Sequence, residues 1–426
     1  MKTDPIKRAL DLRKTLVRKT EQGKELLVVD FTDTLQGKDT SKVVDLMPNP
    51  QGNYIIRSKY FVKSIDPLAY GQYDREFFDV GSKSEKEIYD FIKRQEFDFP
   101  TWFKHEEGFS PRRVCDYNSP LVLQVAGCNF HDGSETGGCL YCFVDDASND
   151  GCFSPGKIYI DIQDTVSAMK EAQERIGGIY EERGYDIVPK AIRMSGGEPT
   201  IALDWITDFW KEIKRQNLDF VGEMDCNLST GRVVDHFERE GVFEEGLLEE
   251  LARVQPLKIK AAIKGTDDRN MQENVQSKTT MNDQLYSLKK LIDAGFDVYP
   301  QMYNPNPLTL EDYLRRMDEE IENFSLRVHI GPLKVYGPTR QRLAYHARKM
   351  SENLPKYTRL GIIGPELLEV IEGRIVVDTD KYIQMVQDRW DANYKNGVKI
   401  IDNYLQREYE VGYKDTLRAD VSLRMA

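Results

Sequence analysis

The sequence predicts an α/β fold: a parallel sheet, open or curled into a partial (β/α)6 TIM-like barrel, with an N-terminal extension and a helical C-terminal region. Two observations predict it. From Pro120 onward, short apolar runs alternate with longer amphipathic stretches, which is the order of strands and crossover helices. Six such apolar runs follow one another, so we expect neighbouring strands to lie parallel, joined by helices.

The strands and helices of this core are predicted from their apolar patterns. The expected strands are residues 121–126, 191–194, 220–224, 257–263, 296–302 and 326–330. The expected helices are residues 165–175, 203–215, 243–254, 282–294 and 310–322. In the second helix, Leu203, Ile206 and Phe209 recur at helical spacing, which is typical of a face packed on a core. Gly295 is a suitable residue to end the fourth helix.

The regions on either side of the core have different patterns. The first 115 residues are highly charged, with a helix expected at 6–22 that ends at Gly23, strands at 26–31 and 54–57, a helix at 83–94 and an aromatic linker at 97–109. From Arg374 onward the chain is predicted to be mostly helical, with an amphipathic face over residues 382–404 that suits core packing or a dimer contact. We expect three units: 1–115, a candidate substrate-recognition domain; 116–340, the core; and 341–426, the helical region.

Composition limits the function classes. Of the 426 residues 40% are hydrophobic, which is enough for a sizeable core, but no run of 18 apolar residues exists that would span a membrane. The first residues contain no apolar stretch of signal-peptide length, so a cytoplasmic protein is expected. A net charge of −12 disfavours a large nucleic-acid-binding surface.

Cysteine spacing is the strongest chemical signal. The chain has six cysteines: Cys115, Cys128, Cys139, Cys142, Cys152 and Cys226. Clustering of this kind favours metal ligands over disulfides. Cys139 and Cys142 fit one short turn, and Cys128 follows the first predicted strand, so the three thiolates can hold three irons of a [4Fe–4S] cluster and leave the fourth iron open. The alternative is a zinc knuckle that uses Cys152 or His131 as a fourth ligand.

A glycine-rich turn follows the second predicted strand, in the sequence Ser195-Gly196-Gly197-Glu198-Pro199. A glycine pair that ends in a carboxylate can hold the ammonium group of an amino acid. Because the carboxyl ends of parallel strands meet at one edge, this turn and the cysteine loop are expected on the same rim. A zinc knuckle gives no reason for the turn to be there.

With these motifs, the chain resembles the radical S-adenosylmethionine (SAM) enzymes over residues 118–335. That family's usual cluster motif is C-x3-C-x2-C with an aromatic residue before the last cysteine, and Tyr141 fills that place. Its Gly-Gly-Glu motif, which binds the methionyl amine, is matched by Gly196, Gly197 and Glu198. The sequence departs from the family in its spacer, residues 129–138, which is longer than the usual three residues.

The resemblance also implies roles at the ends of the third and fourth strands. Asn227, with Ser229, resembles the region that reaches the ribose, and Lys264 resembles a lysine of activase-type members that meets the SAM carboxylate. The alternatives are a buried strand end and a solvated lysine. The implied cofactor-binding residues are Tyr141, Ser195, Gly196, Gly197, Glu198, Asn227, Ser229 and Lys264.

What the resemblance implies is a mechanism in which a reduced [4Fe–4S] cluster cleaves SAM to a 5′-deoxyadenosyl radical that abstracts hydrogen from a small-molecule or peptide substrate. The implied partner is an electron donor of the flavodoxin or ferredoxin type. Alternatives are a glycyl-radical-enzyme activase, an RNA-modifying radical SAM enzyme, and a non-enzymatic zinc or iron–sulfur scaffold. No catalytic side chain is identified.

Other residues have more than one interpretation. His131 is expected to be a solvated loop residue. Asp145 and Asp146 either line a substrate pocket or cap a turn. Five residues near the ends of later strands are candidates to line that pocket: Tyr299, Gln301, Tyr303, His329 and Lys334.

Overall fold

The structure, a computed structural model, describes most of the chain after residue 120 and parts of what precedes it. The described residues are 2–29, 44–48, 54–58, 121–134, 137–151, 157–182, 184, 188–255, 257–359, 361–413, 418, 421 and 423. The predicted helix at 83–94 and linker at 97–109, together with Cys115 and Cys152, lie outside the described residues.

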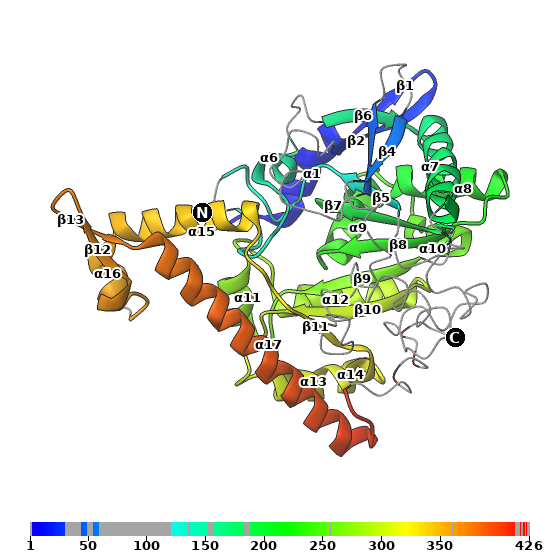
Figure 1. Ribbon diagram of the computed structural model, residues 1–426. Helices are drawn as coiled ribbons and strands as arrows, with labels where there is room; N and C mark the ends of the chain where they lie inside the picture. The colour runs from blue at the N-terminus through cyan, green and yellow to red at the C-terminus, as the bar shows by residue number, and fades with distance from the viewer. Residues whose placement is uncertain are drawn as a thin grey trace.

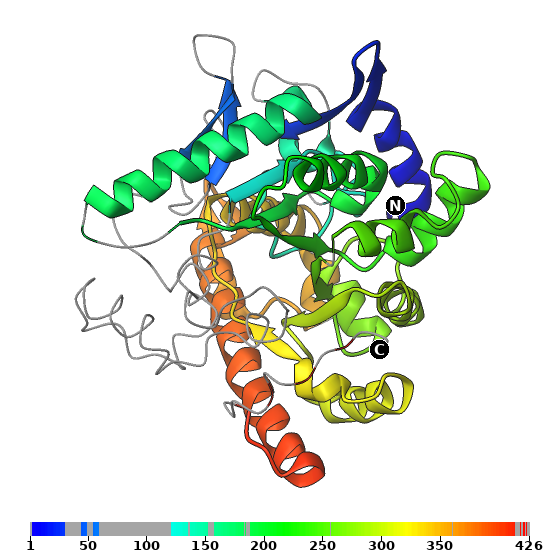
Figure 2. The same cartoon turned by 90° about the vertical axis from the view of Figure 1, so that its right-hand side faces the viewer.

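The core is a parallel sheet whose strands lie side by side in chain order. They are β5 (Leu121–Val125), β7 (Ala191–Gly196), β8 (Val221–Cys226), β9 (Lys258–Ile263), β10 (Asp297–Tyr303) and β11 (His329–Gly331). The sheet curves from β5, drawn in cyan, to β11, drawn in yellow, with helices along its outer side (Figure 2). This arrangement confirms the predicted α/β class with a parallel sheet.

Helices connect the strands, as the alternating pattern predicts. They are α7 (Ile162–Glu182), α8 (Leu203–Arg215), α9 (Thr230–Arg239), α10 (Leu247–Val254), α11 (Asp268–Asn274), α12 (Met281–Asp293), α13 (Leu310–Glu320) and α14 (Phe324–Arg327). The apolar face of α8 is buried as predicted, with the Trp205 and Phe209 rings stacked 5.5 Å apart. The short α9, α11 and α14 were not predicted. Because α14 takes up Leu326 and Arg327, the last strand begins at His329 and not at Leu326.

The N-terminal prediction is partly wrong. Asp4 caps α1 (Pro5–Leu16), which ends before Gln22 because Val17–Thr20 forms β1, antiparallel to β2 (Gly23–Val29). The β-branched Val17 and Thr20 favour an extended chain, and Gly23, with φ 137°, begins β2 opposite Thr20, directly after the two-residue turn, instead of ending a helix.

Further antiparallel strands extend the sheet next to β5. β2 pairs with β5 and with β6 (Lys157–Asp161), so β1 and β2 share the sheet of the core. The predicted strand at 54–57 is β4 (Tyr54–Ser58), paired with β3 (Val44–Pro48) in a separate hairpin.

The C-terminal region is mainly helical, and it lies to one side of the sheet (Figure 1). Its elements are α15 (Gly337–Glu352), α16 (Leu354–Arg359), β12 (Leu368–Ile371), β13 (Arg374–Val377) and α17 (Thr379–Tyr409). The tail from Arg374 onward is mostly helical, as predicted: residues 374–377 pair with β12, and the long helix begins at Thr379. Its predicted face is buried at Tyr382, Val386 and Trp390. None of the helices in the described ranges is long and apolar enough to cross a membrane.

Candidate functional site

The predicted site residues come together in one pocket at the carboxyl ends of the parallel strands. Its lining includes all three motif cysteines and the glycine-rich turn. Of the predicted cofactor-binding residues, those that line it are Tyr141, Ser195, Gly196, Gly197, Glu198, Asn227 and Lys264. Ser229 lies behind this wall, buried, with its hydroxyl accepting a hydrogen bond of 2.9 Å from Asn129.

The cysteine loop is held in place by backbone hydrogen bonds. The amide of Cys142 donates to the carbonyl of Cys139 at 3.0 Å, which closes the short turn that the spacing predicts. Leu140 donates to Asn274 at 2.9 Å, and Cys139 forms an isolated bridge with Val275, so the turn is fixed to the segment that follows α11. The turn can therefore present its two thiols in a defined position.

The glycine-rich turn packs directly on the chain that leads into the cysteine loop. Glu198 donates its amide to the carbonyl of Gly127 at 2.8 Å. A Cβ at position 197 would lie 1.8 Å from that same oxygen, so only glycine fits. Gly196 has φ 108°, which a side chain would also make unfavourable. The two sequence motifs therefore meet in space as predicted.

The Glu198 carboxyl group is buried and held by three hydrogen bonds. One oxygen accepts from the amide and hydroxyl of Thr200, and the other accepts from the amide of Asn227 at 2.8 Å. Burial raises the pKa of Glu198 to about 7, although these hydrogen bonds act to lower it. A cationic ligand nearby would favour the ionised carboxylate.

Asn227 connects the end of β8 to the cysteine loop. Its amide nitrogen donates to Asn129 at 2.8 Å and lies 3.8 Å from the Cys128 sulfur. Its side-chain oxygen accepts from the amide of Ser229 at 2.9 Å. Asn227 is thus buried at a strand end, which is the alternative to a ribose contact that the sequence left open. It also lines the pocket.

Lys264 is buried, so the interpretation as a solvated lysine is wrong. Its Nζ lies 5.8 Å from the centre of the Tyr141 ring. Burial acts to lower the pKa of Lys264, but negative charge at Cys139 and Tyr141 outweighs it and holds this pKa above its usual value. Lys264 therefore brings a cation to the pocket beside the thiols.

Two of the motif thiols, those of Cys128 and Cys139, are in an environment that opposes free thiolates. Burial raises the pKa of Cys128 to about 12, with the nearby Cys139 adding to the effect. Burial also raises the pKa of Cys139, although Lys264 acts to lower it. In the part of the chain that the structure describes, no three His, Cys, Asp or Glu side chains form a group that could hold a single metal ion.

Charged side chains line the inner wall of the curved sheet, and the sequence analysis did not single them out. Arg193 binds Asp225 through both carboxylate oxygens at 2.7–3.2 Å, and the Ser195 hydroxyl donates to Asp225 at 2.6 Å. Below them, Lys260 pairs with Glu223 at 3.0 Å. The alternation of charged residues within apolar strands is the signal that could have found them.

The remaining candidates divide between the pocket and other roles. Gln301, Tyr303 and Lys334 line the pocket, as predicted. Tyr299 instead donates its hydroxyl to Asp297 at 2.7 Å, and the buried ring of His329 packs edge-on against Tyr413 at 6.1 Å. Asp145 caps α6 (Asp146–Asp150) by accepting from Ser148 at 2.9 Å, which is the turn-capping alternative.

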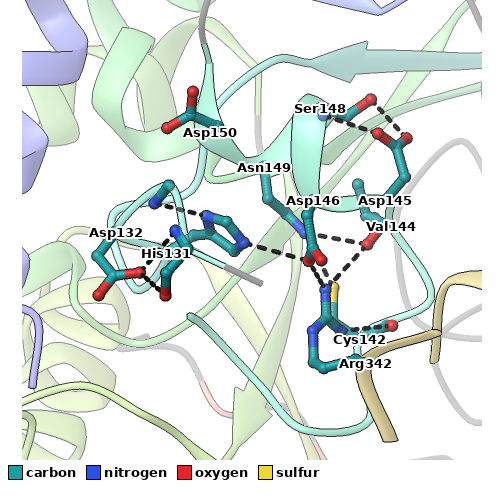
Figure 3. Close-up of polar contacts among 12 residues, drawn as sticks. His131, Asp132, Cys142, Val144, Asp145, Asp146, Ser148, Asn149, Asp150 and Arg342 are labelled. Carbon is teal, nitrogen blue, oxygen red and sulfur yellow. Dashed lines mark hydrogen bonds and ion pairs between the residues drawn. The ribbon is translucent and has the colours of Figure 1, made fainter. Parts of the chain in front are cut away.

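His131 is buried, so the prediction of a solvated residue is wrong. Its Nδ1 accepts a hydrogen bond from the amide of Gly133 at 3.0 Å, which leaves the proton on Nε2 to be donated to Asp146 at 3.2 Å (Figure 3). Both ring nitrogens are therefore engaged, which disfavours His131 as a zinc ligand.

Asp146 also binds Arg342 of α15, which sequence reasoning missed (Figure 3). Burial acts to lower the pKa of Arg342, but negative charge at Cys142 and Asp146 raises it overall. No local pattern predicts this contact, because the two segments are far apart in the sequence.

Comparisons with known proteins add the following findings. No protein-family model matches the chain, and no curated protein does. Among solved structures, the chain is similar to a mutant of spore photoproduct lyase bound to a dinucleoside spore photoproduct, with 13% identity, a TM-score of 0.36, and coverage of 67% of this chain and 72% of that one.

The chain is also similar to OxsB, a cobalamin-dependent S-adenosylmethionine radical enzyme. With aqua-cobalamin and S-adenosylmethionine bound, OxsB has 11% identity and a TM-score of 0.36, over 78% of this chain and 48% of its own. Its apo form gives 10% identity and a TM-score of 0.38, over 72% and 46%. The chain thus spans about half the length of OxsB.

Proposed function

We propose that this protein is a radical SAM enzyme that uses a [4Fe–4S] cluster to cleave SAM reductively and to abstract hydrogen from a small-molecule or peptide substrate. The observation that carries the proposal is the meeting of two motifs in one pocket. Cys128, Cys139 and Cys142 line it together with the Gly196-Gly197-Glu198 turn, at the edge of a parallel sheet where ligands bind.

The residues present fit the two groups. Three thiols converge on the pocket, and burial makes Cys128 and Cys139 poor thiolates unless a metal binds them. The Tyr141 hydroxyl is buried in this wall without a hydrogen-bond partner among the described residues, so a polar ligand would satisfy it. Gly197 lies so close to Gly127 that it must be glycine. The turn therefore has no side chain at this point that would exclude a ligand.

When bound, the cluster and SAM would supply the one-electron chemistry that generates the radical. The chain's own residues would bind and orient them. The three cysteines would ligate the cluster, and Glu198 would accept hydrogen bonds from the methionyl ammonium. Lys264, the buried cation, would meet the SAM carboxylate.

The other predicted roles remain part of the proposal. Ser195, Asn227 and Ser229 would support SAM binding, Asn227 and Ser229 from the end of β8, where they are linked by hydrogen bonds to the cysteine loop. We also propose residues 116–340 as the catalytic core, 1–115 as a candidate substrate-recognition domain and 341–426 as a helical region. The proposed setting is cytoplasmic, with an electron donor of the flavodoxin or ferredoxin type.

The test is anaerobic reconstitution with iron and sulfide, followed by analysis of metal, sulfide and SAM cleavage. We expect about four irons per chain and 5′-deoxyadenosine formed from SAM plus a reductant. About one zinc per chain instead would favour the scaffold alternative.

Two cysteine variants separate ligands from bystanders. Cys139→Ala should lose the cluster and 5′-deoxyadenosine formation. Cys226→Ala is the matched control: it removes a fourth thiol that lines the same pocket but is already hydrogen-bonded to Thr230 at 2.6 Å, and this variant should keep its iron. A Cys139→Ala protein that still formed 5′-deoxyadenosine would contradict the proposal.

A further inference from the structure

A buried cation lies against the turn that carries two of the three motif cysteines. Arg342 is 1% exposed, and its Nη1 donates to the carbonyls of Cys139 at 3.1 Å and Cys142 at 2.9 Å. Thr339, on the same helix, donates its hydroxyl to the Cys142 carbonyl at 3.0 Å. Helix α15 therefore fixes the position of this turn from a distant part of the sequence.

The other side of the guanidinium group faces a carboxylate. Arg342 Nη2 pairs with Asp146, whose same oxygen accepts from His131 Nε2 at 3.2 Å (Figure 3). Because Nη1 is directed to the cysteine turn and Nη2 to Asp146, the positive end of the pair is nearer the cysteines. The long spacer, residues 129–138, thus contributes His131, which holds Asp146 in place.

Charge at this position would act on a cluster held by the turn. Reduction adds one negative charge to an iron–sulfur cluster, so a nearby cation stabilises the reduced form. Arg342 is buried, so salt screens its charge little. A hydrogen bond acts in the same direction, because the Asn149 amide donates to the Cys142 sulfur at 3.4 Å.

We propose that Arg342 is a positioning residue that fixes the Cys139–Cys142 turn and raises the reduction potential of the cluster, and that Asp146 moderates its charge. This inference rests on the proposed function, because it requires the cluster. The proposal predicts that loss of Arg342 and loss of Asp146 shift the reduction potential in opposite directions. A purely structural contact would not produce opposite shifts.

The experiment is an anaerobic redox titration of the reconstituted full chain, followed by electron paramagnetic resonance of the reduced cluster. Arg342→Gln should shift the potential to a more negative value, and Arg342→Lys, which keeps the charge, should shift it less. Asp146→Asn should shift it to a more positive value. The matched control is Arg340→Gln: Arg340 lies on the same helix, but it is 57% exposed and paired with Asp380, so no shift is expected.

Iron and sulfide content are measured first, so that the outcomes can be separated. A wild-type chain that takes up no cluster overturns the proposed function, and this inference with it. A cluster whose potential is unchanged in Arg342→Gln, or that shifts equally in Arg340→Gln, overturns the inference alone. If Arg342→Gln holds no cluster, Asp146→Asn decides: a more positive potential supports the charge role, whereas no shift, a negative shift or loss of the cluster overturns it.

Discussion

The two faces of the parallel sheet are built from different side chains, although they alternate along the same strands. On β9, Ile259 and Ile263 belong to the apolar core beneath the helices, whereas Lys260, and Lys264 directly after the strand, point into the curved sheet. On β8, Met224 lies in the apolar core and Glu223 binds Lys260. The outer face therefore holds the fold together, and the inner face carries charge.

This difference shows how the molecule can bury ionic groups next to a binding pocket. Three ion pairs involve charges of the inner face: Lys260 with Glu223, Arg193 with Asp225, and Asp297 with Arg327 of α14 at 3.0 Å. Buried pairs of this kind contribute little net stability, because desolvation offsets their attraction. They do place polar groups next to the pocket, which apolar side chains at the same positions would not. Four predictions test this difference between the apolar outer face and the charged inner face.

The largest effect is expected from breaking the buried pair of Glu223 and Lys260. Glu223→Leu leaves Lys260, 7% exposed, without its carboxylate partner, and this should lower the free energy of unfolding by about 3–5 kcal/mol in urea denaturation. Adding Lys260→Met should recover most of that loss, because the uncompensated charge is gone. A double variant as unstable as the single one would mean that the pair stabilises the fold directly.

The outer face should respond to lost volume. Ile259 is fully buried, so Ile259→Ala should cost about 3 kcal/mol of unfolding free energy through lost burial and the cavity left behind. Ile375→Ala is the matched control: Ile375 is 57% exposed, and its replacement should change stability by less than about 0.5 kcal/mol. Equal effects of the two changes would contradict the assignment of Ile259 to the core.

The pocket rim should make stability depend on pH. The pKa of Glu198 is about 7 in the folded protein, against about 4.3 for an unperturbed glutamate. The folded state therefore holds this proton more tightly. The contribution of this proton to stability, at most about 4 kcal/mol, is fully present below the unfolded pKa and is lost as pH rises through the folded pKa near 7.

Urea denaturation without SAM at pH 4.5, 6 and 7.5 would measure this dependence, and Glu198→Gln should remove most of it. The reverse trend, with Glu198 stabilising the protein more as pH rises, would show that the hydrogen bonds from Thr200 and Asn227 outweigh burial.

The smallest effect on stability is expected at the open end of the inner face. The side chains of Arg193 and Asp225 are 25% and 28% exposed, so water screens this pair and Asp225→Asn should cost less than about 1 kcal/mol. Because Asp225 also lines the pocket, the same change should alter 5′-deoxyadenosine formation by the reconstituted protein. A large loss of stability would mean that this pair behaves like the buried pair of Glu223 and Lys260.

Local patterns predicted the outer face well and the inner face poorly. Apolar periodicity identified five of the parallel strands within a few residues, together with the buried face of α8, because these features depend on neighbouring residues. The motifs also identified the cysteine loop and the glycine-rich turn, because both follow strands on one edge.

What the sequence did not reveal depends on contacts between distant segments. The helix predicted to reach Gln22 ended at Leu16, because pairing with β2 overrode its helical pattern. Arg342 and His131 were missed as a connected pair for the same reason: each is an ordinary polar residue until the fold brings both to Asp146. Arg193 and Asp225 could have been noticed as charges inside apolar strands.

The antiparallel strands added next to β5 also affect how copies of the chain meet in solution. An exposed β-strand edge invites pairing with another chain. Here β2 covers β5, and β6 covers the other side of β2; this outer strand is only Lys157–Asp161, with a charged residue at each end. A short strand that carries charge is a poor template for aggregation, so this margin of the sheet protects the protein against self-association.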